Sequence, residues 1–347
     1  MGEGDNRMTV RSVLAGCGSM GNRWLEYLLA RSDVEMVALV DIFTANAEMM
    51  NERHGLQLPV YDSVARAIED TGAELLLDTS IPDAHADNAL TAMKLGASVM
   101  MEKPMSVTMR DASQLIEVSE QTSQFCAVMQ NRRYTKEIRS LKQDLDAGVI
   151  GTPGFFSTNF FLGPRFGGFR ELMDHPLLLD MAIHTFDAAR YLIGAEPVSV
   201  YCHEFNPEGT WYTGNASAVC IFEFNNGAVF SYNGSWSALG HATSWEGAWR
   251  INGSKGTALW DGDSPARYQV IEQGAATDQA VLTTKEGIIY WSGQERRDAC
   301  LNEMFDALLT GNRSETDIRD NIHSVAMMLG AIESAKRQQR ILLSELY

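Results

Sequence analysis

The feature that most constrains this chain is a glycine pattern close to its beginning. An apolar run over residues 13–15 leads into Gly16-Cys17-Gly18-Ser19-Met20-Gly21, and residues with helical spacing follow. In a strand–turn–helix unit, Gly16 permits the tight turn, Gly18 lets a pyrophosphate approach the backbone, and Gly21 lets the helix pack closely on the sheet. The pattern predicts a dinucleotide site at the start of that helix. A glycine-rich turn that binds nothing is the alternative.

An acidic residue at the end of the second expected strand strengthens the dinucleotide prediction. The apolar run Val37-Ala38-Leu39-Val40 ends in Asp41, about 20 residues beyond Gly21, where such folds place the acid that binds the adenosine ribose. The Asp41 carboxylate can accept hydrogen bonds from both ribose hydroxyls, and it would repel a 2′-phosphate. Because Ile42 supplies no compensating positive charge, the sequence favours NAD over NADP. An ordinary acid between a strand and a turn is the alternative.

Length and charge limit the class of protein. The chain has 347 residues, more than the roughly 250–300 residues that one core usually supports, so two domains are expected. A net charge of −17 repels nucleic-acid phosphates, which argues against nucleic-acid binding. No apolar run approaches the ~18 residues of a transmembrane helix, and the first residues lack a signal-peptide core. We therefore expect no membrane association.

The cysteines indicate the redox environment. The chain has 5 cysteines, which are widely spaced and form no C-x-x-C pair. This odd, scattered set is typical of free thiols in a reducing cytoplasm, and it offers no zinc site. We expect a cytoplasmic protein without a structural metal.

Strand and helix patterns alternate through the first part of the chain. Residues 1–8 are expected to form a disordered tail. Strands are expected over residues 9–15, 34–40, 60–61, 74–78, 98–101 and 125–129, and helices over 20–30, 45–53, 62–69, 84–94 and 109–121. This alternation predicts a parallel, doubly wound sheet over residues 9–130, a Rossmann domain that binds the dinucleotide.

The pattern changes after residue 130. Aromatic and β-branched segments predict strands over residues 155–161, 198–205, 216–224, 228–236, 245–251 and 257–260, and Asn225-Asn226-Gly227 predicts a hairpin turn. Helices are expected over residues 134–147, 178–192, 297–309 and 321–336. Direct hairpins make a sheet mainly antiparallel, so residues 131–347 are expected to form a second α/β domain.

Polar residues follow several of the strands expected in the first domain. Ligands of an open parallel sheet bind beyond the carboxyl ends of its strands. Ser80-Ile81-Pro82 and Glu102-Lys103-Pro104 occupy two such ends, so we expect both segments to lie along the dinucleotide. His85 follows the Pro82 turn and is expected to line the same groove. Lys103 is either a surface ion-pair partner of Glu102 or a cation that stabilises an oxygen changing between hydroxyl and carbonyl.

A second cluster lies on the helix expected over residues 178–192. Asp180 and His184 are four positions apart, so they share one helix face. A carboxylate beside an imidazole can hold and tune a general base. Two metal ligands and a plain polar stripe are the alternatives, but no third ligand with clear spacing follows, and no metal site is predicted. His175 precedes this helix and is expected near the same cleft.

The tryptophans of the second domain allow more than one interpretation. Trp236, Trp245 and Trp249 lie in or beside expected strands. They belong either to the core of the sheet or to a face between subunits. Sugar-binding sites also use aromatic faces, and we keep Trp236 as a candidate substrate contact.

The order of these motifs resembles that of the Gfo/Idh/MocA family, named for glucose–fructose oxidoreductase, inositol dehydrogenase and the rhizopine protein MocA. The resemblance extends from Val10 to about Arg340. Beyond the glycine loop and Asp41, it rests on Thr79-Ser80-Ile81-Pro82-Asp83-Ala84-His85, Glu102-Lys103-Pro104, Asn131-Arg132-Arg133-Tyr134 and Asp180-Met181-Ala182-Ile183-His184-Thr185-Phe186-Asp187. Ala182 stands where the family often has glycine, a change that suits a helix.

The resemblance implies an architecture and residue roles. The Rossmann domain would precede an α/β domain with a large, open, mostly antiparallel sheet, which often packs against a partner subunit in homodimers or homotetramers. Lys103 would bind the reacting oxygen, His184 would take the hydroxyl proton, and Asp180 would hold a neighbouring hydroxyl and orient His184. The expected cofactor contacts are Gly16, Gly18, Ser19, Met20, Gly21, Asp41, Ile42, Ser80, Pro82, His85, Glu102, Lys103 and Asn131. The expected substrate contacts are Lys103, Arg133, His175, Asp180, His184 and Trp236.

The resemblance also implies an activity. The expected function is NAD-dependent hydride transfer between the nicotinamide and a secondary alcohol or ketone of a sugar, inositol or related polyol. One alternative is an NAD-dependent redox glycosidase, which oxidises a sugar transiently and cleaves a glycoside without net cofactor reduction. Another is a non-catalytic dinucleotide-binding sensor, and the retained Lys103, Asp180 and His184 argue against it.

Overall fold

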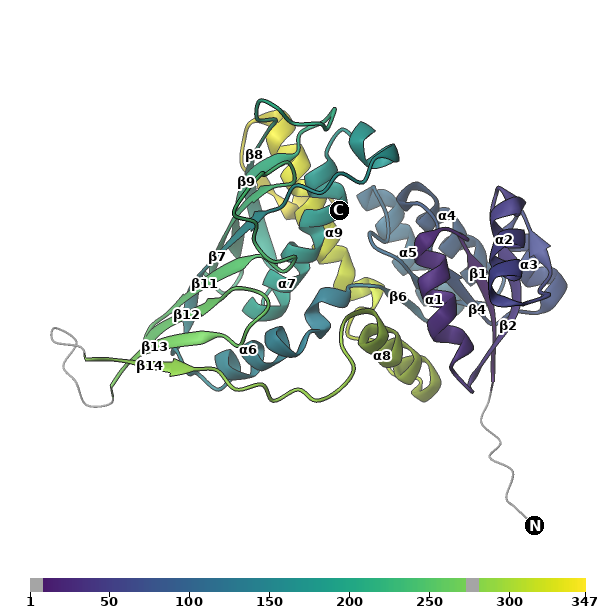
Figure 1. Ribbon diagram of the computed structural model, residues 1–347, viewed down its shortest axis with the longest axis horizontal. Coiled ribbons are helices and arrows are strands. Elements are labelled where there is room, and N and C mark those ends of the chain that lie inside the picture. The colour runs from purple at the N-terminus through teal and green to yellow at the C-terminus, as the bar shows by residue number, and fades with distance from the viewer. Residues whose placement is uncertain (1–8, 273–280) are drawn as a thin grey trace, which may run out of the picture. The chain divides into compact units, whose positions relative to one another are not determined.

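The computed structural model describes residues 9–272 and 281–347, so the tail expected over residues 1–8 lies outside the described residues. The chain divides into two compact units (Figure 1). Unit 1 comprises Met1–Met129 and Leu301–Ile322, and unit 2 comprises Gln130–Cys300 and His323–Tyr347. The first break lies between Met129 and Gln130, one residue before the boundary that the sequence analysis places between residues 130 and 131. Residues 301–322, which the sequence analysis assigns to the second domain, pack instead with the first.

Unit 1 is built on a parallel sheet of 6 strands in the order β3-β2-β1-β4-β5-β6. The strands are β1 (Val10–Ala15), β2 (Val34–Val40), β3 (Val60–Tyr61), β4 (Leu75–Asp78), β5 (Ser98–Met101) and β6 (Cys126–Val128). The helices between them are α1 (Ser19–Leu29), α2 (Thr44–His54), α3 (Val64–Thr71), α4 (Pro82–Lys94) and α5 (Met109–Thr122). The strand order reverses between β1 and β4, which is the point where doubly wound sheets bind ligands.

The central strands of this sheet are apolar because helices cover both of their faces. All four residues of β4 and all four of β5 are buried. Val13 and Leu14 in β1 are completely inaccessible to solvent. Continuous apolar runs of this kind are typical of parallel sheets, which is why the sequence predicts this sheet well.

The returning segment of unit 1 completes the edge of the parallel sheet. The N–H of Val128 in β6 donates to the carbonyl oxygen of Thr316 at 3.0 Å, and Ala127 forms an antiparallel bridge with Asp317. Farther along, the Arg31 guanidinium lies 4.2 Å from the ring centre of Phe305. Residues 301–322 therefore supply a partner for a strand edge that unit 1 would otherwise expose.

Unit 2 contains a sheet of 9 strands in the order β14-β13-β12-β11-β7-β10-β9-β8-β15. The strands are β7 (Pro153–Phe161), β8 (Pro197–Phe205), β9 (Ser217–Phe224), β10 (Val229–Ser235), β11 (Ala248–Gly253), β12 (Gly256–Trp260), β13 (Arg267–Ile271), β14 (Leu282–Glu286) and β15 (Ile341–Leu342). Only the β7–β10 pair is parallel, and every other neighbouring pair is antiparallel. The mostly antiparallel second sheet is confirmed.

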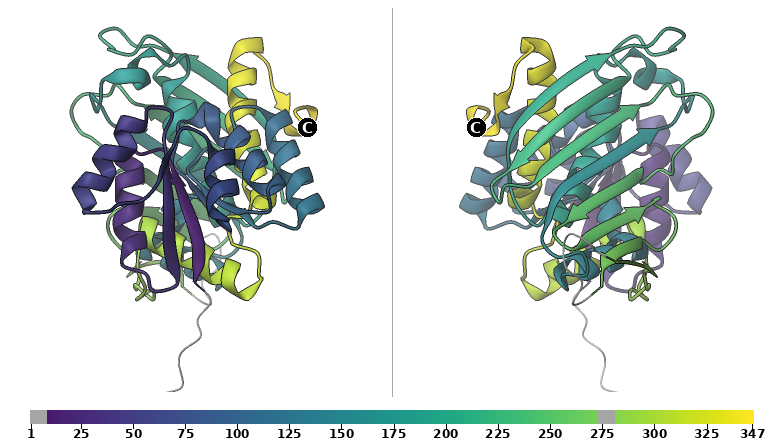
Figure 2. Two further views of the ribbon diagram at one scale, coloured as in Figure 1. Left: turned by 90° about the vertical axis from the view of Figure 1, so that its right-hand side faces the viewer. Right: turned by 90° about the vertical axis from the view of Figure 1, so that its left-hand side faces the viewer.

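Helices cover one face of this sheet, and its strands lie in front of them in the right-hand view of Figure 2. The helical elements of unit 2 include η1 (Asn131–Tyr134), α6 (Lys136–Asp146), η3 (Leu177–Ala182) and α7 (Ile183–Ile193), with parts of α8 (Arg296–Thr310) and α9 (Ile318–Arg337). Phe186 of α7 is fully buried, with its ring centre 4.8 Å from that of Phe222 and 5.3 Å from that of Tyr232. Alternate strand residues thus form the core of unit 2.

Two parts of unit 2 differ from the sequence prediction. Strands β13, β14 and β15 were not predicted. The side chains of β14 are mostly exposed and β15 has only two residues, so neither gives a usable pattern. Strand β13 does alternate between exposed and buried side chains, and it was missed. The helix expected over residues 178–192 begins as the π-helical segment η3 and becomes α-helical only at Ile183. A π-helical turn leaves the hydrophobic spacing nearly unchanged, so periodicity does not reveal it, although such turns are frequent at functional sites.

No helix among the described residues is both long enough and apolar enough to cross a membrane.

Candidate functional site

The glycine loop of unit 1 has the geometry that its three glycines predict. Gly16 adopts φ +88°, and a Cβ there would lie 2.5 Å from the Ser80 nitrogen. A Cβ on Gly21 would lie 2.1 Å from the Gly16 carbonyl oxygen. A Cβ on Gly18, by contrast, would meet nothing within 4 Å. Two glycines are therefore required by the fold, while the third leaves open space above the backbone that a ligand can use.

Helix α1 begins at this open position. Gly18 precedes the helix and offers no side-chain cap, so hydrogen-bond donors of the first turn are left for another acceptor. Ser19 and Met20 open the helix and are both exposed. An uncapped helix N-terminus beside an unobstructed backbone fits the phosphates of a dinucleotide.

Asp41 is joined to the glycine loop at the end of β2. Its Oδ2 accepts a 2.9 Å hydrogen bond from the Cys17 N–H. Its Oδ1 accepts from the Phe43 N–H at 2.9 Å and from Asn46 Nδ2 at 3.2 Å. Each carboxylate oxygen can accept two bonds, so Oδ2 retains capacity for a ribose hydroxyl. The sequence predicts a ribose-binding acid here but not that this acid also fixes the loop.

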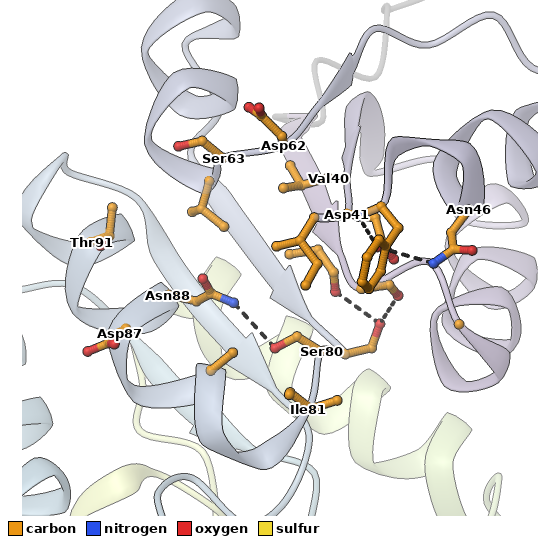
Figure 3. Close-up of a pocket in the computed structure, with 18 of the residues that line it drawn as sticks. Val40, Asp41, Asn46, Asp62, Ser63, Ser80, Ile81, Asp87, Asn88 and Thr91 are labelled. Carbon is orange, nitrogen blue, oxygen red and sulfur yellow. Dashed lines mark hydrogen bonds between the residues drawn. The ribbon is translucent and has the colours of Figure 1, made fainter. Parts of the chain in front are cut away.

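A cavity of about 630 Å³ lies along these strand ends, and all of its lining residues belong to unit 1 (Figure 3). Gly16, Gly18, Asp41, Ile42 and Ser80 line it, as the sequence analysis expected of cofactor contacts. Ile81, from the expected Ser80-Ile81-Pro82 segment, also lines it, together with residues for which no role was expected, among them Phe43, Asn46, Asp62, Ser63, Asp87, Asn88 and Thr91. Ile42, Phe43 and Ile81 are more than half exposed and give this cavity an apolar wall suited to a flat aromatic ring.

Two other expected cofactor residues support this cavity without lining it. Pro82 is the first residue of α4, where its missing N–H costs nothing. His85 is 1% exposed, with Nδ1 2.8 Å from the Pro104 carbonyl oxygen and Nε2 3.2 Å from the Ser80 carbonyl oxygen. His85 therefore lies between the loops that follow β4 and β5.

The Glu102-Lys103-Pro104 segment follows β5. Glu102 is 8% exposed and its Oε1 accepts a 3.0 Å bond from Trp24 Nε1. Burial raises the pKa of the Glu102 carboxyl, an effect that the nearby Lys103 charge and the Trp24 bond oppose. The peptide between Lys103 and Pro104 is cis. Lys103 itself is half-buried, and its charge acts on the buried Glu102 carboxyl, as the ion-pair alternative requires.

Asp180 and His184 lie on adjoining helical segments of unit 2. Asp180 belongs to η3, and its Oδ2 is 2.6 Å from Arg170 Nε in the segment η2 (Gly168–Leu172). His184 lies in the first turn of α7 and is 8% exposed. The sequence analysis did not identify Arg170 as the partner of Asp180, because the two are joined only by the fold of an irregular loop.

A small cavity in unit 2 brings His184 together with two groups that the sequence analysis did not single out. Arg132, from η1, and Glu246, from the loop before β11, line this cavity with His184. The Glu246 side chain is 2% exposed and is bonded by Arg132 Nη1. Arg132 lies within a sequence motif, but no local pattern marks Glu246.

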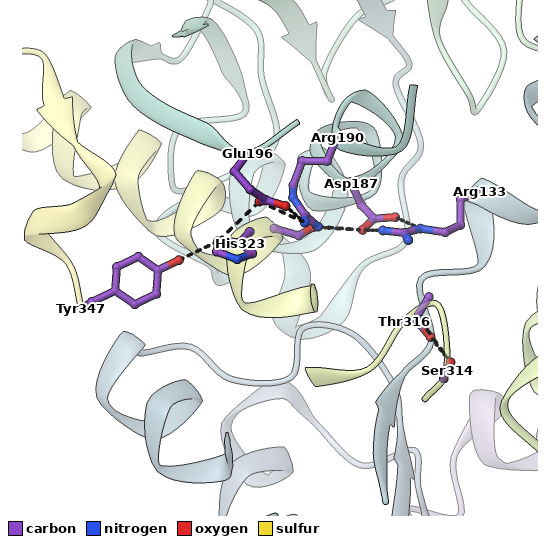
Figure 4. A network of polar contacts seen from close by, with 9 residues as sticks. Arg133, Asp187, Arg190, Glu196, Ser314, Thr316, His323 and Tyr347 are labelled. Atoms are coloured by element: carbon purple, nitrogen blue, oxygen red, sulfur yellow. Dashed lines mark hydrogen bonds and ion pairs between the residues drawn. The ribbon is translucent and has the colours of Figure 1, made fainter. Parts of the chain in front are cut away.

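Arg133 and Asn131 lie beside Arg132 in η1. Arg133 is 5% exposed, and both of its bonds to Asp187 are side chain to side chain, with Nε 2.9 Å from Oδ2. Asp187 also accepts from Ser324 at 2.9 Å, and Figure 4 shows this network continuing through Arg190. The Arg133 guanidinium thus anchors α7. The Oδ1 of Asn131 is buried and has no hydrogen-bond partner among the described residues.

The last two expected substrate contacts also have partners within unit 2. His175 Nδ1 lies 2.6 Å from Glu204 Oε2. Trp236 is 2% exposed and stacks on Tyr212, with ring centres 5.8 Å apart and planes at 14°. This geometry favours the core interpretation of Trp236, because the side chain is buried and its ring stacks on Tyr212.

All 5 cysteines are free and buried. Within residues 9–272 and 281–347, no group of three or more His, Cys, Asp or Glu side chains is arranged to hold a metal ion.

Comparison with known proteins decides the family. Residues 10–130 match the model described as the oxidoreductase family with an NAD-binding Rossmann fold. Residues 138–259 match the GFO/IDH/MocA C-terminal domain. The chain belongs to the GFO/IDH/MocA oxidoreductase family. The resemblance drawn from the motifs is confirmed, and so are the oxidoreductase class and the NAD-binding Rossmann fold.

Several relatives of this family member have names that state an activity. The scyllo-inositol 2-dehydrogenase (NAD(+)) of Bacillus subtilis is 27% identical over 226 residues, 63% of this chain and 65% of that protein. The myo-inositol 2-dehydrogenase of Thermotoga maritima is 24% identical over 309 residues, 85% of this chain and 86% of that protein. The chain thus belongs to a family of oxidoreductases with an NAD-binding Rossmann fold, and its relatives include proteins named inositol dehydrogenases.

A solved structure supports the fold. An oxidoreductase from Agrobacterium radiobacter, crystallised with NAD+, L-tartaric acid and magnesium, has a TM-score of 0.83 and 19% identity. The match covers 98% of this chain and 100% of that one. At this identity the likeness concerns the fold.

Proposed function

We propose that this protein is an NAD-dependent dehydrogenase that oxidises a secondary alcohol of an inositol, sugar or related polyol, or reduces the matching ketone. The observation that carries the proposal is the unit 1 cavity, in which an open glycine turn and an acid at the end of β2 meet. Relatives named inositol dehydrogenases give the substrate class.

The residues of unit 1 fit a dinucleotide. The open backbone at Gly18 and the uncapped start of α1 suit its pyrophosphate. The Asp41 carboxylate suits a ribose diol, and Asp62 and Asp87 add further negative charge to the lining. Since Arg and Lys are absent from that lining, a 2′-phosphate would be repelled without compensation. We therefore assign NAD rather than NADP.

We assign the reaction to Lys103, Asp180 and His184. When bound, the nicotinamide ring accepts a hydride from the alcohol carbon. His184 takes the hydroxyl proton as a general base, and the Lys103 ammonium stabilises the oxygen as it becomes a carbonyl. Asp180 holds a neighbouring hydroxyl and orients His184. Asp180 also accepts a hydrogen bond from Arg170, so the substrate hydroxyl would bind beside that arginine.

We further propose a homodimer or homotetramer that buries the open face of the nine-stranded sheet. Apolar side chains on this face are about 40% exposed or more, among them Phe155, Tyr201, Phe205, Val219 and Ile221. Large apolar side chains gathered on the exposed face of a sheet are frequent at interfaces between subunits. Light scattering after gel filtration measures the mass of the protein in solution, and a monomer at micromolar concentration would contradict the proposed oligomer.

The 5 free thiols suit a reducing compartment, and we propose that the protein is cytoplasmic.

The proposed activity is tested by absorbance at the reduced-nicotinamide band. The protein is mixed with NAD or NADP and a panel of inositols, free sugars and glycosides, and NAD with one polyol is expected to give a rise. Glycoside cleavage without a rise would instead establish the redox glycosidase. Tight dinucleotide binding with neither reaction would establish a sensor and overturn the proposal.

A further inference from the structure

Glu246 of unit 2 is a buried carboxylate shared by two arginines. Arg132 Nη1 donates to its Oε2, and Arg296 Nη1 lies 2.6 Å from its Oε1 in an ion pair that is not aligned as a hydrogen bond. The Glu246 side chain is 2% exposed, against 15% for Arg132 and 53% for Arg296. A carboxylate this buried is stable only when it is paired and bonded. The ion pair with the better-buried arginine, Arg132, is therefore expected to stabilise the Glu246 carboxylate more than the pair with Arg296.

Arg132 is fixed from several sides. Its Nη1 also donates to the Trp245 carbonyl oxygen, and its guanidinium carbon lies 5.8 Å from the Trp245 ring centre. Its Nη2 lies 3.9 Å from the sulfur of Met181, the residue that follows Asp180 in η3. Burial lowers the pKa of the Arg132 guanidinium, and the Glu246 charge opposes that shift. Arginine stays protonated under such conditions, so the cation is held in one place.

The fixed cation and its counter-charge lie at the wall of the His184 cavity. Arg132, Glu246 and His184 line it, with Ile138, Thr185, Ala188 and Trp260 supplying the apolar part. Little solvent screens charges in such a place, so each one acts on the ionisation of the imidazole.

Other charged groups of unit 2 lie on the elements that pack on α7. Arg133 is neutralised by Asp187, and Asp180 is paired with Arg170. On α6, Arg139 stacks on Tyr191 of α7, and Lys142 is paired with Asp146. The buried phenol Tyr232 of β10 has a pKa raised well above its usual value, chiefly by burial, and stays neutral. The Arg132–Glu246 pair is therefore the charged pair that shares the cavity of His184.

We propose that Arg132 and Glu246 are positioning residues that hold His184 in a charge-balanced cavity and thereby keep its imidazole able to switch between neutral and protonated forms. The inference rests on the proposed function in giving His184 the role of general base. The two charges have opposite effects on the ionisation of the His184 imidazole. The cation alone favours neutral imidazole, and the carboxylate alone favours imidazolium. Removing either charge shifts the titration of His184, in opposite directions.

The test uses the full-length protein and follows the imidazole carbons of the 7 histidines by NMR between about pH 5 and 9, the range where imidazoles titrate. A His184→Gln variant assigns the His184 signal. We expect Glu246→Gln to lower its titration midpoint by about 0.5–1 unit and Arg132→Gln to raise it by about 0.5–1 unit. The double variant should return to within about 0.3 unit of the wild type, because it removes both charges and their opposite effects cancel.

Two further variants separate charge from shape. Arg132→Lys keeps the cation and should leave the midpoint within about 0.3 unit. Arg296→Gln removes the exposed partner of the same carboxylate and should have a smaller effect than Arg132→Gln, since exposed charges are screened. If Glu246→Gln does not fold, the difference in His184 titration midpoint between Arg132→Gln and Arg132→Lys still tests the inference. Equal midpoints in those two variants would overturn it. A shift of the midpoint in the same direction in Glu246→Gln and Arg132→Gln would also overturn it.

Kinetics distinguish this inference from the proposed function. With an active polyol, the acidic limb of the kcat/KM profile should move with the NMR midpoints, while the Kd for NADH stays unchanged. If no polyol is oxidised, the proposed function fails, and the NMR midpoints still decide whether the pair sets the ionisation of His184.

Discussion

The Cys17 N–H donates a 2.9 Å hydrogen bond to Asp41 Oδ2, so the acid at the end of β2 also holds the first turn of the glycine loop. One carboxylate thus couples the place where the ribose is expected to the place where the phosphates are expected. A substitution at Asp41 acts on both.

We expect Asp41→Ala to weaken NADH binding by about 10–100-fold, the scale of hydrogen bonds to a charged group. Loss of the negative charge should also reduce discrimination against NADPH. Fluorescence titration with both nucleotides measures the two effects. Asp62→Asn serves as the comparison: it removes a charge from the same cavity, but Asp62 is exposed and lies outside the loop, so both effects should be smaller than in Asp41→Ala. An unchanged preference for NADH in Asp41→Ala would remove Asp41 from ribose recognition.

The glycine loop allows a matched pair of variants. Gly21→Ala places a Cβ 2.1 Å from the Gly16 carbonyl oxygen, so the helix must shift and both stability and NADH affinity should fall. Gly18→Ala adds a methyl group to open space in an extended backbone. Its unfolding free energy should change by less than about 0.5 kcal/mol, while NADH affinity falls at least tenfold by obstruction of the pyrophosphate. Thermal unfolding and titration on both variants test this contrast, and unaltered NADH binding by Gly18→Ala would contradict it.

Lys103→Ala and His184→Ala should each lower kcat by about 10²-fold or more, the usual effect of losing an electrostatic or acid–base group. NADH affinity should change much less, because neither residue lines the unit 1 cavity. Steady-state kinetics with the best polyol of the panel measure kcat, and direct titration measures the Kd for NADH. Turnover close to that of the wild type in either variant would exclude that residue from the reaction.

Buried thiols predict how stability depends on alkaline pH. Burial, reinforced by the Asp41 charge, raises the pKa of the Cys17 thiol from 9.0 to about 12. Between these two values the unfolded chain loses its thiol proton while the folded chain keeps it, so the free energy of unfolding falls as pH rises above about 9. Urea unfolding at several pH values should show a shallower decline in Cys17→Ala. An identical pH slope in the variant would refute the assignment to this thiol.

The sequence predicts unit 1 more completely than unit 2, for a physical reason. Buried parallel strands such as Leu75–Asp78 are apolar throughout, and helices separate them at regular intervals. In unit 2 the strand pattern is lost at Leu282–Glu286, whose side chains are mostly exposed. Arg267–Ile271 alternates between exposed and buried side chains and was missed nonetheless. The π-helical turn at Leu177–Ala182 keeps a helical hydrophobic pattern. Periodicity therefore finds most elements that bury a continuous face, but it misses short strands and does not distinguish a π-helical turn from an α-helical one.

The residues of the candidate site likewise divide into those that a sequence motif can specify and those that it cannot. Gly16, Gly21 and Asp41 occupy positions fixed by local geometry, so a motif can specify them. Glu246 and Arg170 reach their partners through loops, over 114 and 10 residues of chain respectively, and no local spacing encodes either contact. The burial of Trp236 likewise depends on Tyr212, which comes from a different loop.

The return of residues 301–322 to unit 1 has a consequence for synthesis on the ribosome. The amino-terminal unit is translated early, but β6 lacks the partner provided by Thr316 and Asp317 until nearly the whole chain has emerged. During that interval the last strand of unit 1 presents an unpaired edge, although residues 130–300 of unit 2 have already been synthesised. The dinucleotide-binding half of the protein is therefore begun first but completed only after most of the other half has been made.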